Sequence, residues 1–234
     1  MNSIFPIDIE LLKPKIYFRP MSLVSEIFDL VQKQFESEGT GHDWYHIDRV
    51  RKVALHLAKL EGGDSEVVEL AALLHDIADH KFHGHDLAVG PAKAREIILE
   101  KGGSVDLADK VGLIISETSF KGAGVETPVS SIESAVVQDA DRLDAIGAIG
   151  IARTFAYGGS IGQPIYDPEL VPEAHDSFEA YAKTRTSTIN HFYEKLLLIK
   201  DRINTDSGKK IADERHKVME EFLDQFHKEW EVDL

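Results

Sequence analysis

Residues 70–80 read Leu-Ala-Ala-Leu-Leu-His-Asp-Ile-Ala-Asp-His and place a histidine and an aspartate side by side in an apolar stretch. Apolar residues also precede this stretch and leave almost no polar face, which is typical of a buried helix. Asp64 or Ser65 can serve as its N-cap. We therefore expect His75 and Asp76 inside a buried helix. Because an ionised carboxylate without a partner is costly to bury, the pair indicates that a cation lies beside it.

The whole chain is long enough for one domain with a sizeable core, at 234 residues and 43% hydrophobic content. We expect this domain over residues 21–234. Residues 1–20 have no clean helical period and contain three prolines, which predicts an extended N-terminal arm. No apolar run approaches the roughly 20 residues of a membrane span, and the N-terminus lacks the features of a signal peptide. A cytoplasmic protein without membrane association is the expectation.

Composition also limits the chemistry of the chain. The absence of cysteine excludes disulfides, thiolate zinc sites and cysteine nucleophiles, and leaves His, Asp and Glu as the strong metal ligands. The formal net charge of −15 argues against binding to duplex nucleic acid. Small anions remain candidate substrates, because a metal and a few cations can reverse the local field inside one cleft.

Helical periodicity recurs along the rest of the chain, and no strand pattern of useful length is present. We therefore predict an all-α fold. The expected helices run from Ser22 to about residue 38, from about 43 to 61, from 65 to 80, from Pro91 to 101, from Ser104 to 115, from 133 to 146, from Phe178 to Ile203 and from Lys209 to Trp230.

Histidines are concentrated near the opening stretch, since seven of the eleven fall between positions 42 and 85. His46 lies three and four residues from an apolar row, so its ring should point toward the core. Consecutive helices with a short connection are antiparallel neighbours, so His46 and His75 could meet. The alternative for His46 is an ordinary core or capping histidine.

Two aspartates on the helix predicted at 133–146 share a face with apolar residues, namely Asp141 and Asp144, whereas Asp139 lies nearer the opposite side. Asp141 is the better ligand candidate, and Asp144 could orient it or touch substrate. With His46 and the pair at 75–76 this makes two imidazoles and two carboxylates. Such a mixed set suits transition metals more than Ca²⁺, and it leaves coordination positions for water and substrate.

The order His46, His75-Asp76, Asp141 resembles the H…HD…D signature of the HD-domain superfamily of metal-dependent phosphohydrolases, over about residues 22–230. The resemblance implies a single HD-domain helical bundle and makes these four residues the metal ligands. It implies one divalent ion, with Mn²⁺ favoured and Mg²⁺, Fe²⁺, Ni²⁺, Co²⁺ or Zn²⁺ as alternatives. Residues 138–159 and 191–201 are similar to those of bacterial-type nucleotide pyrophosphohydrolase-like HD proteins.

Further residues are candidates for the chemistry around such an ion. Asp79 could transfer a proton to or from the attacking water or the leaving group, or it could simply end the helix. Arg49 could neutralise a phosphate. His191 and Lys195, four residues apart on one predicted helical face, could do the same, although solvated charges are the alternative.

The resulting hypothesis is a phosphohydrolase that acts on a small nucleotide and converts a nucleoside triphosphate to monophosphate and pyrophosphate. One alternative is a 5'-nucleotidase-type phosphomonoesterase, and another is a regulatory module that binds metal and nucleotide without turnover. The sequence leaves the oligomeric state open, a homodimer included.

Overall fold

The computed structural model describes residues 22–36, 43–78, 88–118, 127–173 and 186–232, and these contain helices and no strand. The all-α prediction is confirmed. The arm predicted for residues 1–20 lies outside the described residues. Among the described helices, none is both long and apolar enough to cross a membrane.

The helices are α1 (Leu23–Phe35), α2 (Trp44–Glu61), α3 (Ser65–Leu74), α4 (Val89–Glu100), α5 (Val105–Thr118), α6 (Ile132–Asp144), α7 (Gly147–Ser160), α9 (Thr188–Glu194) and α10 (Asp206–Glu231), with short 3-10 helices η3 (Leu196–Leu198) and η4 (Lys200–Arg202).

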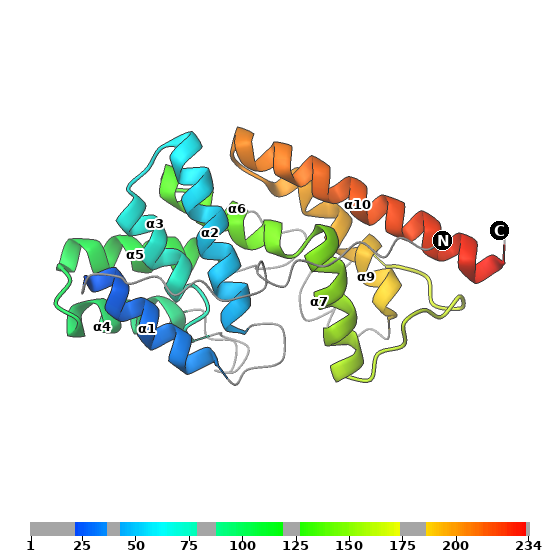
Figure 1. The fold of residues 1–234 in the computed structure, drawn as a ribbon, viewed down its shortest axis with the longest axis horizontal. Coiled ribbons are helices and arrows are strands. Elements are labelled where there is room, and N and C mark those ends of the chain that lie inside the picture. The colour runs from blue at the N-terminus through cyan, green and yellow to red at the C-terminus, as the bar shows by residue number, and fades with distance from the viewer. Residues whose placement is uncertain (1–21, 37–42, 79–87, 119–126, 174–185, 233–234) are drawn as a thin grey trace, which may run out of the picture.

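Helix α6 lies at the centre of this arrangement. It packs against α2, α3 and α5, and also against α7 and α10. Figure 1 shows α1 to α5 gathered at one end of the molecule and α7, α9 and α10 at the other, with α6 between the two groups. Side chains at both ends of α6 can therefore reach several helices that are distant in sequence.

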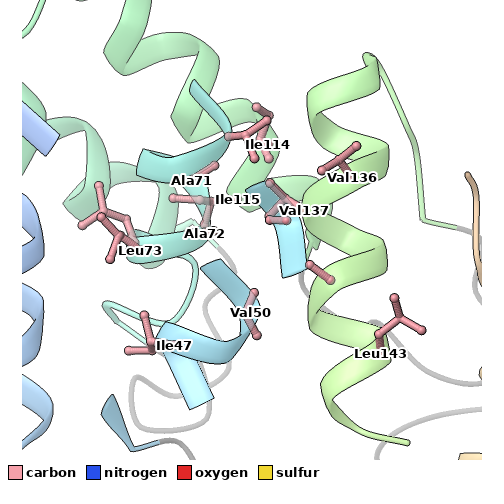
Figure 2. Close-up of a cluster of buried hydrophobic side chains, with 14 of the residues drawn as sticks. Ile47, Val50, Ala71, Ala72, Leu73, Ile114, Ile115, Val136, Val137 and Leu143 are labelled. Atoms are coloured by element: carbon pink, nitrogen blue, oxygen red, sulfur yellow. The ribbon is translucent and has the colours of Figure 1, made fainter. Parts of the chain in front are cut away.

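The core beside α6 is built from apolar side chains at helical spacing. Figure 2 shows these side chains converging from α2, α3, α5 and α6, and each is almost completely excluded from solvent. Because this packing leaves little freedom in the helix positions, it fixes where the ends of α2, α3 and α6 lie. The labelled members are Ile47, Val50, Ala71, Ala72, Leu73, Ile114, Ile115, Val136, Val137 and Leu143.

A buried carboxylate on α6 sets the position of α10. The side chain of Asp139 accepts hydrogen bonds from the backbone N–H groups of Asn204 and Thr205, each at 2.8 Å, and from both of their side chains. Thr205 is in turn the N-cap of α10. Asp139 thus anchors the start of the C-terminal helix to the centre of the molecule.

Helix α3 begins where the sequence predicts, because the Asp64 side chain accepts hydrogen bonds from the first backbone N–H groups. The prediction that it continues through residue 80 is wrong, since the helix ends at Leu74 and His75 opens a turn over residues 75–78. The His75 ring accounts for this ending, because its Nδ1–H donates to the carbonyl of Ala72 at 2.8 Å. One of the carbonyls that a helix end leaves without a partner is thereby satisfied.

The long helix predicted over 178–203 is also wrong. Only residues 188–194 are α-helical in the described part of this range, and two 3-10 helices follow. Lys195 leaves the helical conformation, with φ −143° and ψ −56°. His191 and Lys195 therefore do not share a helical face. Neither glycine nor proline marks this break in the sequence.

Candidate metal centre

The first turn of α2 aims His46 into the interior. Asp43 caps the helix and accepts a hydrogen bond from the backbone N–H of His46 at 2.9 Å. Trp44 packs edge-on against Phe28 of α1, with ring centroids 4.7 Å apart. Both contacts fix the start of the helix, and His46 in this first turn is only 1% exposed.

His75 approaches from the end of α3 and meets His46. The two Nε2 atoms lie 3.2 Å apart, and the ring planes are inclined at 68° to each other. The Nδ1 atom of each ring faces an acceptor, which is the carboxylate of Asp144 at 2.7 Å for His46 and the carbonyl of Ala72 for His75. These acceptors hold the ring protons on Nδ1, so in neutral imidazoles both Nε2 atoms present lone pairs to each other. Two facing lone pairs repel unless a cation lies beside them.

Two carboxylates complete the cluster. Oδ2 of Asp76 lies 3.4 Å from Nε2 of each histidine, and Oδ1 of Asp141 lies 3.6 and 3.8 Å from the same atoms. The ligand atoms of His46, His75 and Asp141 all lie within 4.8 Å of one another. The structure therefore brings together the four residues that the sequence predicts as metal ligands.

The ends of α3 and α6 suit a cation for a second reason. The last turn of a helix carries a partial negative charge, and Asp141 adds a full charge there. An imidazole and carboxylate set of this kind fits a divalent transition metal. In such a site His46, His75, Asp76 and Asp141 would hold the ion.

The charge around His46 also favours a cation. Burial lowers the pKa of the imidazole, but hydrogen bonds to Asp144 and Asp76 outweigh it and raise the pKa to about 9. At neutral pH the metal-free cluster therefore holds a proton on His46, and binding of a metal ion there would release this proton.

Asp144 faces the protein interior. Arg49 donates to it from Nε at 2.7 Å and from Nη2 at 2.9 Å, and Arg153 donates from Nη1 at 2.8 Å. Burial alone would raise the pKa of the Asp144 carboxyl, yet its hydrogen bonds with His46 and Arg49 hold that pKa well below the usual range. Asp144 is thus an ionised carboxylate, directed at three protein side chains.

The other predicted site residues lie in different settings. Arg49 is paired with Asp144, and its side chain is 32% exposed. His191 is part of α9, where burial and the charge of Lys195 lower its pKa to about 3, so the imidazole is neutral at physiological pH. The sequence predicts that His191 and Lys195 both present positive charge to a phosphate, but with a neutral His191 only Lys195 can do so. Asp79 lies outside the described residues.

Sequence reasoning missed Arg153. It is the one charged residue of α7, whose sequence is otherwise made of small, hydroxyl and apolar residues. A single arginine in such a helix is a usable signal, because burying it requires an acidic partner. Its partner could not be identified from spacing alone, since Asp144 ends α6 and Arg153 belongs to the next helix, α7.

Comparison with known proteins shows strong similarities. Residues 43–146 match the family model of the HD domain. The chain is 37% identical to the protein YpgQ of Bacillus subtilis over 213 residues. This alignment covers 90% of this chain and 95% of YpgQ.

Solved structures agree. A crystal structure of an HD-superfamily hydrolase from Bacillus thuringiensis has a TM-score of 0.69 and 42% identity, over 89% of this chain and 96% of that one. The crystal structure of Bacillus subtilis YpgQ in complex with ADP has a TM-score of 0.67 and 32% identity, over 88% of this chain and 97% of that one.

Proposed function

Because the chain belongs to the HD-domain superfamily of metal-dependent phosphohydrolases, we propose that its substrate is a small nucleotide, cleaved from the triphosphate to monophosphate and pyrophosphate. The observation that carries this proposal is the convergence of His46 and His75, with their Nε2 atoms 3.2 Å apart, beside Asp76 and Asp141. A divalent ion at such a site lowers the pKa of a bound water and stabilises charge on a phosphoryl group.

Two arginines next to the cluster support an anionic substrate. Arg49 and Arg153 both pair with Asp144, so two guanidinium groups face this carboxylate, and a divalent ion would offset the charges of Asp76 and Asp141. In a chain with a net charge of −15, the ion and these two guanidinium groups are what would attract a phosphate. We propose that Arg49, which is partly exposed, contacts the phosphate chain.

The remaining roles extend the expectations from sequence. We propose Asp79 as the group that transfers a proton during hydrolysis, since it follows the ligand Asp76 by three residues. Lys195 and His191 are proposed at the phosphate end of the substrate, Lys195 as a cation and His191 as a neutral hydrogen-bonding group. Mn²⁺ is the proposed ion, and one ion is proposed for each chain.

Similarity to a relative whose structure contains a nucleotide supports a nucleotide as the substrate. YpgQ, the relative from Bacillus subtilis, was crystallised with ADP. Release of pyrophosphate rather than phosphate rests on the likeness of residues 138–159 and 191–201 to nucleotide pyrophosphohydrolase-like HD proteins.

A panel of ribo- and deoxyribonucleoside mono-, di- and triphosphates tests this function, with Mn²⁺ added and with pyrophosphate and phosphate resolved. Triphosphates should yield pyrophosphate with the wild-type chain, and Asp76→Ala should reduce turnover to background. Asp109→Ala, which removes an exposed carboxylate paired with Arg95, is the matched control and should keep full activity.

Other products would revise the proposal. Phosphate release from monophosphates would make the protein a nucleotidase. Nucleotide binding without any turnover would make it a sensor. Turnover that persists in Asp76→Ala would show that the reaction does not use this site. Repeating the panel with Mg²⁺, Fe²⁺, Co²⁺, Ni²⁺ and Zn²⁺ after chelation tests the choice of metal.

A further inference from the structure

The two histidines of the cluster are oriented by different kinds of partner. The Nδ1–H of His75 donates to a backbone carbonyl three residues earlier, so the orientation of this ring follows from the local chain. The Nδ1–H of His46 donates to Asp144, which lies 98 residues later in the sequence. The orientation of His46 therefore depends on a side chain of another helix.

Without other hydrogen-bond donors, the Asp144 carboxylate would be unfavourable as an ionised acceptor for His46 at this position. It is the last residue of α6, where the helix dipole disfavours a negative charge, and it is only 2% exposed. A buried carboxylate is kept ionised only when donors compensate for lost hydration. Arg49 supplies two N–H groups for this purpose and Arg153 supplies one.

Arg153 comes from outside the segment that matches the HD family, which ends at residue 146. Its Nη1 also lies 3.3 Å from the backbone carbonyl of Asp144, so it contacts both the side chain and the helix end. Arg215 of α10 donates to the neighbouring carbonyl of Leu143. Helices α7 and α10 thus hold the end of α6 at the point where it meets His46.

We propose that Asp144 is a positioning residue for His46, and that Arg153 keeps Asp144 in place for this role. By accepting the Nδ1–H, Asp144 selects the tautomer with a lone pair on Nε2 and fixes the direction of that lone pair. Its negative charge also makes Nε2 a stronger ligand. The inference rests on His46 as a metal ligand, and it does not depend on which substrate is cleaved.

The test measures the Kd of the full-length chain for Mn²⁺, from the electron paramagnetic resonance signal of free Mn²⁺, with no substrate present. Asp144→Ala should weaken Mn²⁺ binding by about 10- to 100-fold. Asp144→Asn keeps an oxygen that can accept from Nδ1–H but removes the charge, so its Kd should lie between those of the wild type and the alanine variant.

Asp139→Ala is the matched control for position 144. Asp139 belongs to the same helix, is equally buried and accepts hydrogen bonds from two residues, but its partners Asn204 and Thr205 belong to the connection before α10. This variant should lose stability, and because Asp139 does not bond to His46, it should weaken Mn²⁺ binding far less than Asp144→Ala does. Equal weakening in Asp139→Ala and Asp144→Ala would overturn the proposal, because the effect would then follow from general destabilisation.

A second pair of variants tests the arginine. Arg153→Met should weaken Mn²⁺ binding, and Arg153→Lys, which keeps a donor and a charge, should restore part of the loss. Arg51→Met is the control, because Arg51 is likewise shielded from most solvent and pairs with two carboxylates, those of Asp48 and Glu69, neither of which belongs to the cluster. If Asp144→Ala does not fold, Asp144→Asn and Arg153→Met still decide the question.

The assay separates this proposal from the choice of ligands. His75→Ala should abolish tight Mn²⁺ binding. If it does so while Asp144→Ala and Arg153→Met bind Mn²⁺ as the wild type does, the ligands stand and the positioning role is refuted. If His75→Ala also binds normally, the metal lies elsewhere and the positioning role fails with it.

Discussion

His191 links protonation to folding at the scale of a single residue. Its pKa falls from the ordinary value of 6.5 to about 3 in the folded chain, through burial and the charge of Lys195. Between these two values the unfolded chain binds a proton that the folded chain does not. The free energy of unfolding should therefore decrease as pH falls from about 6.5 toward 3, with a contribution of at most about 1.4 kcal/mol per pH unit.

Replacement of this histidine tests the sign. His191→Gln should make the decrease in unfolding free energy between pH 6.5 and 4 shallower, as measured by urea denaturation at successive pH values. His56→Gln, at an exposed position of α2, is the control and should leave the wild-type slope. An unchanged slope in His191→Gln would mean that folding does not lower the pKa of His191.

Some residues of the candidate site could be predicted from the sequence and others could not. His75 and Asp76 stand out because polar groups next to an apolar helix need compensation, and Asp141 stands out by its place in an apolar row. The roles of Asp144 and Arg153 did not emerge in the same way. Each depends on a contact between helices, and neither spacing nor residue type determines which helices meet.

At the scale of one element, α6 carries both Asp139, which anchors α10, and Asp141, a proposed metal ligand. Asp139→Ala leaves the backbone N–H groups of Asn204 and Thr205 without their acceptor in a buried place. We expect a loss of about 3 kcal/mol in the free energy of unfolding, as is usual when buried donors lose a charged acceptor. Urea denaturation at neutral pH measures this difference.

An exposed aspartate gives the comparison. Asp106→Ala removes a carboxylate whose side chain is 79% exposed and that pairs with Lys110 one turn later. Pairs of this kind contribute about 0.5 kcal/mol or less. If both variants lose the same small amount, the hydrogen bonds of Asp139 do not stabilise the fold.

Helix ends are the features that the sequence predicted least well. The starts of α1 and α3 follow the N-cap rule, because Ser22 and Asp64 bond to nearby backbone groups. The end of α3 was misplaced, since a histidine side chain takes the place of the usual glycine. The break at Lys195 was missed because an apolar row continues across it. Periodicity detects which residues face the core, and it does not detect where the backbone changes direction.

For the whole molecule, metal removal should lower thermal stability. The folded cluster gathers the proposed ligands from α2, the end of α3 and α6, which are far apart in an unfolded chain. At a free Mn²⁺ concentration 100 times its Kd, binding should add about 2.7 kcal/mol to the free energy of unfolding. Thermal melting with Mn²⁺ and after chelation measures the difference as a change in Tm.

His75→Ala provides the reference for this experiment. Its Tm should be the same with and without Mn²⁺, because the cluster has lost one of its two imidazoles. An equal response of wild type and variant to Mn²⁺ would indicate stabilisation by ions bound at other places on this acidic chain.

The ion pair between Asp144 and Arg153 limits which segments of such a protein can be exchanged by recombination. A recombination event that exchanged residues 43–146 alone would carry Asp144 into its new host and leave Arg153 behind. The transplanted carboxylate would then need a new cation, or would have to be replaced together with the arginine. A segment that can be exchanged without compensating substitutions therefore extends at least into α7. Residues 144 and 153 should also be substituted together among descendants of this chain.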